Sequence, residues 1–139
     1  MAENSGSLQG DISKLLVRIA VGGLMMFHGI AKLLNGIGFI EQSLNTAGLP
    51  GAIAYGVYIG EIVGPIMVIV GFGTRFGAAA IAVDMLVALS LVHSRQFFSL
   101  AQGGSWSVEL PVFYLLCALA LVLMGSGRYG ISRGKGILA

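Results

Sequence analysis

The sequence has little charge for its length. Among 139 residues there are 8 Lys and Arg and 6 Asp and Glu, so charged residues make up 10% of the chain. Soluble domains carry about 25% charged residues. A chain with so few hydrated side chains cannot cover a water-facing globule, which excludes a soluble enzyme and a disordered tail. The formal net charge of +2 is spread along the chain, so a nucleic-acid partner, which requires a clustered basic surface, is excluded as well.

Cysteine is nearly absent too, since Cys117 is the only thiol. One thiol cannot form an internal disulfide or a Cys-x-x-Cys redox couple, and it cannot supply the ligands of an iron–sulfur cluster. No tight spacing such as His-x-x-x-His occurs, so we predict no metal site. His28 and His93 could lie in one leaflet on two helices, but two histidines without supporting spacing are weak evidence, and haem is not expected. Redox chemistry would therefore need a bound cofactor or a partner protein.

What the chain does have is long apolar runs: 56% of the residues are hydrophobic and the mean hydropathy is +0.90. About 20 apolar residues are needed for a helix to cross a bilayer. Four windows qualify, at about residues 12–34, 52–72, 75–93 and 108–124. We predict an all-α integral membrane protein, a single domain over residues 1–139 that forms an antiparallel four-helix bundle. Pro65 lies inside the second window and is expected to kink it.

The distribution of basic residues predicts the orientation. Cytoplasmic loops are enriched in Lys and Arg. With four spans, six basic residues share the side of both termini, namely Lys14, Arg18, Arg75, Arg128, Arg133 and Lys135, and the other side has Lys32 and Arg95. We therefore expect the bacterial plasma membrane, with short cytoplasmic tails at residues 1–11 and 129–139.

Two shorter segments add to this picture. The first outer loop should contain a short surface helix, because Phe39, Ile40 and Leu44 recur at helical spacing. A basic start and the apolar run Ile19–Phe27 resemble a secretion signal, but His28 and Lys32 stand where a cleavage site would be, so a retained anchor is expected.

Glycines recur every fourth residue on the second span, at Gly56, Gly60 and Gly64. Such a stripe of small residues lets another helix backbone approach closely. It predicts either a face for a homo-oligomer or close packing inside one bundle.

The most informative residues are the ionisable ones at membrane depth, where a central charge costs about 2.5–3.5 kcal/mol. Glu61 and Asp84 lie near the middle of the second and third spans. The others lie along the first span or toward the outer ends, namely Arg18, His28, Lys32, His93 and Glu109. One interpretation is structural ion pairing, with Arg18 or Lys32 as the partner of Glu61 or Asp84. The other is a functional pocket or a proton path.

These residues, in this order, resemble the DoxX family of small bacterial and archaeal membrane proteins, from about Leu15 to Tyr129. Asp84 is not part of the pattern. The matching features are Arg18, His28-Gly29, Lys32, Gly48-Leu49-Pro50, Glu61 with Gly64, Gly71 before Thr74-Arg75, His93 and Glu109. The resemblance implies a four-helix membrane bundle. It also implies an accessory or small subunit of a membrane redox system, as in thiosulfate:quinone oxidoreductase and assemblies that protect against oxidative and thiol stress.

The leading hypothesis is a redox-linked subunit that engages a quinone or a partner oxidoreductase. Lys32, His28 and His93 are the candidate quinone pocket, with Lys32 or His28 bonding a quinone carbonyl. Glu61 and Glu109 would exchange protons, and Asp84 is a further candidate. The alternatives are a non-catalytic scaffold or assembly factor that docks a redox partner, and a transporter for a small solute or protons.

Overall fold

A computed structural model of the chain describes residues 2–136, and within this range the chain is helical and has no β-strand. Five α-helices alternate with short 3-10 and π segments. In chain order the elements are α1 (Ala2–Asn35), α2 (Gly38–Thr46), η1 (Gly51–Gly56), η2 (Ile59–Val63), α3 (Gly64–Val70), α4 (Thr74–Leu91), η3 (Ser94–Gln96) and α5 (Glu109–Met124).

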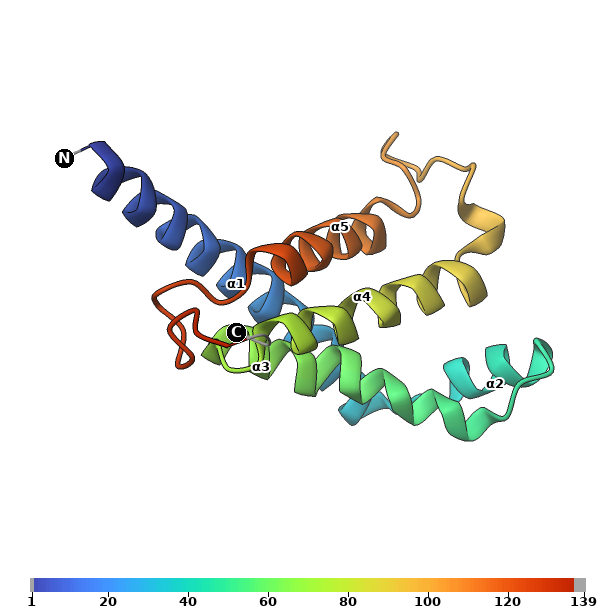
Figure 1. The fold of residues 1–139 in the computed structure, drawn as a ribbon. Helices are drawn as coiled ribbons and strands as arrows, with labels where there is room; N and C mark the ends of the chain where they lie inside the picture. Colours follow the sequence, from blue (N-terminus) through green and yellow to red (C-terminus); the bar gives the residue numbers. More distant parts are fainter. Residues whose placement is uncertain (1, 137–139) are drawn as a thin grey trace.

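The long elements form an antiparallel bundle (Figure 1). The segments η1, η2 and α3 together make one helical rod that runs back along α1, and α4 and α5 follow as the third and fourth rods. Each rod packs against the next, and α5 also packs against α1, so the four rods close into a ring. Apolar side chains from all four fill the centre, among them Met25, Val68, Ile81 and Leu121.

Three of the predicted spans are present as apolar helical segments long enough to cross a membrane. They cover Leu8–Asn35, Gly51–Val70 and Thr74–Leu91. The fourth, α5, is apolar but has 16 residues, fewer than the roughly 20 that span the hydrocarbon. That α5 crosses the bilayer therefore stays a prediction.

The outer surface of the bundle is apolar, which is the reverse of a soluble protein. Large hydrophobic side chains point outward on several helices, with Leu16 63% exposed and Phe27 71% exposed. Further examples are Leu34, Val83, Leu116 and Leu123. An apolar surface of this extent is stable only against lipid or another apolar surface, so the chain is a membrane protein in contact with the bilayer.

The predicted short helix in the first long loop is confirmed as α2. Leu44 is buried in a small cluster with Ala54 and Val57, and Ile40 packs against the same cluster. The apolar face of α2 is thus used to cover the end of the rod that follows it. Figure 1 shows α2 and the segment between α4 and α5 at one end of the bundle.

The chain leaves α5 at the opposite end and folds back over the turn between α3 and α4. The Ile131 N–H donates to the Val70 carbonyl at 3.2 Å, and the Ser132 N–H donates to the Gly71 carbonyl at 3.1 Å. Of the predicted tail at 129–139, residues 129–136 are described and form these turns, and residues 137–139 lie outside the described residues.

The segment predicted as an N-terminal tail is helical, because α1 already begins at Ala2; Met1 lies outside the described residues. A helix, once nucleated, gains one hydrogen bond per added residue, so it extends beyond the apolar window. That this segment is a cytoplasmic tail stays a prediction. The segment after α5 meets α1 at one end of the bundle, where the Arg128 N–H donates to Asp11 Oδ1 at 3.1 Å.

Candidate functional site

The second rod departs from α-helical geometry around Glu61. Pro65 has no N–H, so in a regular α-helix the carbonyl of Glu61 would lose its partner. The chain widens instead into the π segment η2, in which the Gly64 N–H bonds to the carbonyl of Ile59, five residues back. The kink predicted at Pro65 therefore takes the form of a π turn. Such turns are common at functional sites, and this one contains Glu61.

Close packing against α1 supports this irregular turn. A side chain added at Gly29 would collide with the Glu61 carbonyl and with Ile62. Gly29 is thus the residue of α1 that touches the backbone widened by the π turn. The absence of a Cβ there is a condition for the two rods to approach at the depth of Glu61.

Lys32 and Glu61 form an ion pair between α1 and the second rod. The Lys32 ammonium lies 2.6 Å from both carboxylate oxygens of Glu61. Glu61 is 4% exposed, and the Lys32 side chain is 27% exposed. Tyr58 adds a longer contact, its hydroxyl donating to the Lys32 carbonyl at 3.3 Å. Of the two cations weighed for ion pairing with Glu61, Lys32 is the one the structure places there.

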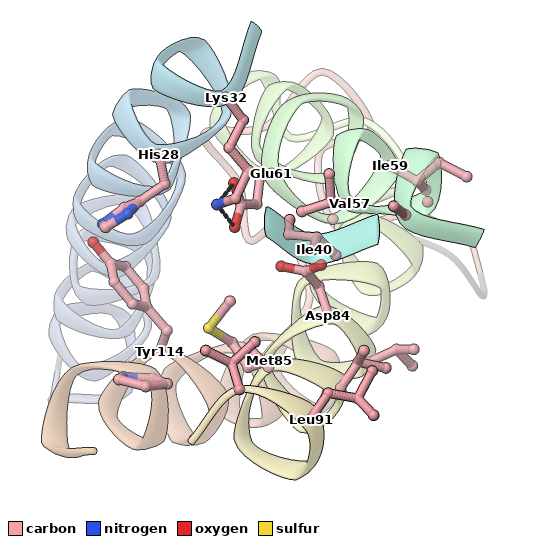
Figure 2. A pocket seen from close by; sticks show the side chains of 18 of the residues that line it. His28, Lys32, Ile40, Val57, Ile59, Glu61, Asp84, Met85, Leu91 and Tyr114 are labelled. Atoms are coloured by element: carbon pink, nitrogen blue, oxygen red, sulfur yellow. Dashed lines mark hydrogen bonds and ion pairs between the residues drawn. The ribbon is translucent and has the colours of Figure 1, made fainter. Parts of the chain in front are cut away.

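Asp84 of α4 brings a second carboxyl group to this pair. It lies near enough to interact electrostatically with both Glu61 and Lys32, and Figure 2 shows all three side chains pointing into one space. Gly60 makes this approach possible, since a side chain there would collide with Asp84. A second acidic group thus lies beside an ion-paired one, a composition that can take up or release a proton without creating an isolated buried charge.

Across the same space lie His28 of α1 and Tyr114 of α5. Their rings meet edge to face with centroids 5.9 Å apart, and Figure 2 shows the Tyr114 hydroxyl turned toward the imidazole. Tyr114 is buried, whereas His28 is exposed at its outer side. Sequence reasoning missed Tyr114. The available signal was a phenol within an otherwise apolar window, because a buried hydroxyl requires a partner.

These side chains line a cavity of about 780 Å³ between the rods and α2. Its walls are mostly apolar, and the ionisable groups converge on one part of them. His93 also lines the cavity, and its Nδ1 lies 3.1 Å from Gln96 Oε1. Volumes of about 300–1,000 Å³ with few polar groups are typical of small-molecule sites. Within residues 2–136 no group of three or more His, Cys, Asp or Glu side chains could hold a metal.

Glu109 does not belong to this site. It is the first residue of α5, it is exposed, and it does not line the cavity. The structure thus does not bring Glu109 to Glu61, and a proton-exchange role for it stays a prediction. A carboxylate in the first turn of a helix is stabilised by the helix dipole, which accounts for Glu109 without any ligand.

Arg18 is also not the ion-pair partner that the sequence suggested. It is 0% exposed, and its guanidinium donates to three backbone carbonyls, those of Val68 at 2.8 Å, Ile69 at 2.8 Å and Ser126 at 2.7 Å. These carbonyls lie near the C-terminal ends of α3 and α5, where helices leave acceptors unsatisfied and favour positive charge. Arg18 therefore clamps two helix ends onto α1.

The glycine stripe packs within the bundle for two of its three members. Side chains added at Gly60 or Gly64 would collide with α4, at Asp84 and at the Gly77 carbonyl respectively. Gly56 has open space beside it and lines the cavity. Close packing inside one chain thus explains Gly60 and Gly64, and a homo-oligomer face at this stripe stays a prediction.

Comparisons with known proteins agree with the resemblance in sequence. The family model named DoxX matches residues 13–94, more than half of the chain. An uncharacterized protein of Haemophilus influenzae is 34% identical over 115 residues, covering 80% of this chain and 81% of that protein. A Bacillus subtilis protein named "Putative oxidoreductase CatD" is 30% identical over 116 residues, covering 84% and 81%. No solved structure matches the chain significantly. The extent of the family match and these two relatives establish that the chain belongs to the DoxX family.

Proposed function

We propose that this protein is a redox-linked membrane subunit whose cavity binds the headgroup of a quinone and exchanges protons with it. The observation that carries the proposal is the Lys32–Glu61 ion pair beside Asp84 in the wall of a largely apolar cavity. The name of the Bacillus subtilis relative, an oxidoreductase, is consistent with this role.

The cavity suits the chemistry of a quinone headgroup. A quinone ring is apolar and flat, with a carbonyl acceptor on each of two opposite edges. Lys32 and His28 supply donors on α1, and the Tyr114 hydroxyl supplies one on α5. The volume of about 780 Å³ accommodates a ring of this size with part of an isoprenoid tail.

Reduction of a bound quinone to a quinol consumes two electrons and two protons, and a partner oxidoreductase supplies the electrons. The residues of this chain handle the protons. Lys32 orients a carbonyl oxygen through its ammonium, while Glu61 and Asp84 hold and transfer a proton beside it. Asp84 thereby takes the role that the sequence assigned to Glu109.

The proposed placement in the membrane follows from the charges at the two ends. Lys14, Arg75, Arg128 and Arg133 gather at the end of the bundle where α1 starts and α5 ends. With that end in the cytoplasm, α5 forms the fourth span of a plasma-membrane bundle. The cavity then lies in the outward half of the protein.

Quinone binding to the purified full-length protein in mild detergent tests the proposal. We expect saturable binding of a short-chain ubiquinone or menaquinone analogue, weakened at least tenfold in Glu61→Gln. Glu109→Gln is the matched control, because its carboxyl lies outside the cavity, and it should bind like the unmodified protein. The double variant Lys32→Met/Glu61→Met removes both charges while keeping the volume, so it should fold and fail to bind.

Three outcomes would overturn the proposal. Absence of saturable binding to the unmodified protein would return the choice to a scaffold that docks a redox partner. Unchanged binding in a folded double variant would separate the ion pair from the ligand. Solute or proton uptake by proteoliposomes without an electron donor would instead identify a transporter.

A further inference from the structure

A second, polar pocket lies at the opposite end of the bundle from the quinone cavity. It has a volume of about 300 Å³ and is formed by Asp11 and Lys14 of α1, the start of α4, the last residue of α5 and the segment after it. Four of the residues that line it are basic and one is acidic, namely Lys14, Arg75, Arg128, Arg133 and Asp11. The pocket therefore has a formal excess of three positive charges, which favours an anion.

The one acidic group is already neutralised within the protein. Asp11 accepts the Arg128 N–H at 3.1 Å through Oδ1, and its Oδ2 lies 3.7 Å from Arg128 Nε. Among the described residues, no carboxylate lies within ion-pair distance of Lys14, Arg75 or Arg133. Three cations thus converge on one small pocket without a counter-charge from the part of the chain that the structure describes.

Arg75 independently indicates that this pocket takes a ligand. Its Nε is buried, and within the described part of the chain it has no hydrogen-bond partner. A buried charged donor without an acceptor is costly. Arg75 is also the second residue of the 18-residue helix α4, so the positive end of that helix dipole reinforces the same location.

The backbone holds Arg133 in an unusual conformation at the rim. Its φ of +48° is the only positive value at a non-glycine residue among those described. L-residues adopt this left-handed region at a cost, and such outliers gather at functional sites. The loop also turns through Gly127 and Gly134 with positive φ values, which brings its residues 126–128 and 133–134 to the pocket wall.

We propose that this pocket binds a phosphate group, with anionic phospholipid headgroups and free phosphate as its two sources. Three cations with arginine forks match the geometry of phosphate oxygens. The side chains of Phe72, Tyr129 and Ile131 at the same end are exposed, and acyl chains can contact them. The site is independent of the quinone cavity, so either proposal can fail without the other.

The test uses delipidated full-length protein in mild detergent, with phosphatidylglycerol, phosphatidylcholine and inorganic phosphate as separate probes. Thermal stability and native mass spectrometry report binding. We expect phosphatidylglycerol to raise Tm and to remain bound, with at least tenfold weaker binding in Arg75→Gln/Arg133→Gln, because each lost charged contact weakens binding by about that factor. Arg95→Gln, in η3 at the other end, should bind like the unmodified protein.

The probes and variants distinguish the possible ligands and can overturn the proposal. A shift with inorganic phosphate that the double variant loses would make the free anion the ligand. Equal shifts with phosphatidylcholine, whose headgroup has a compensating ammonium, would overturn the proposal, as would full retention of the phosphatidylglycerol effect in the double variant. If the double variant is itself unstable, the exposed Arg133→Gln alone supplies the comparison, with the same two outcomes.

Discussion

Removing the ammonium of Lys32 while keeping the length of its side chain gives a direct test of the buried ion pair. In Lys32→Met, the carboxylate of Glu61 would lose the group that lies 2.6 Å from both of its oxygens. Asp84 and Glu61 would then lie near each other with no cation beside them. We therefore expect a large loss of stability in the single variant.

The size of the stability loss expected in Lys32→Met follows from the geometry and burial of the Lys32–Glu61 ion pair. Two unit charges about 4 Å apart attract by about 4 kcal/mol at an effective dielectric constant of about 20. Leaving one member of a buried pair alone costs about 3–5 kcal/mol. Because the Lys32 side chain is 27% exposed, we expect the lower end of that range, about 3 kcal/mol. The double variant Lys32→Met/Glu61→Met removes both charges and should lie within about 1 kcal/mol of the unmodified protein.

The free energy of unfolding is to be measured by reversible SDS titration in mixed micelles, followed by far-UV circular dichroism. Arg95→Met is the matched control, because Arg95 is exposed at the same end of the bundle, and it should change stability by less than about 0.5 kcal/mol. A loss below about 1 kcal/mol in Lys32→Met would refute the reasoning. So would a double variant as unstable as the single one, since the two charges would then not be coupled.

Two further substitutions test the packing that positions the site. Gly29→Ala should destabilise the protein by about 1–3 kcal/mol, because the added methyl group collides with the Glu61 carbonyl. Gly23→Ala, which meets nothing, should be neutral or stabilising by up to about 1 kcal/mol in the same titration, and equal effects of the two would contradict the close approach. Arg18→Met should cost at least about 3 kcal/mol by removing three charged hydrogen bonds to carbonyls, and a loss under about 1 kcal/mol would show that the clamp is weak.

The positions of the helices were largely predictable because hydropathy depends on local composition alone. The third and fourth windows, at 75–93 and 108–124, differ from α4 and α5 by at most two residues at either end. The π turn was not predictable in the same way. Pro65 indicates that a carbonyl loses its partner, but whether the helix bends or widens depends on the neighbouring rod, and here Gly29 leaves room for widening.

The site was predictable as a set of residues, but its pairing was not. His28 and Lys32 lie one helical turn apart, and their shared face follows from helical periodicity. Which cation meets Glu61 depends on the depth of each group. Arg18 is about 21 Å along α1 from Lys32 at 1.5 Å per residue, so it reaches the other end of the bundle. Glu109 fell outside the site for a similar reason, since the N-terminus of α5 projects it away from the cavity.

The Arg18 clamp also bears on the order in which the protein can assemble during synthesis. Its acceptors lie 50, 51 and 108 residues further along the chain. When α1 leaves the ribosome, its guanidinium has none of these partners, and the carbonyl of Ser126 emerges only after α5 has been made. The first helix therefore cannot reach its final, fully bonded environment until the last helix arrives. Tight association of the bundle thus becomes a late event, coupled to completion of α5.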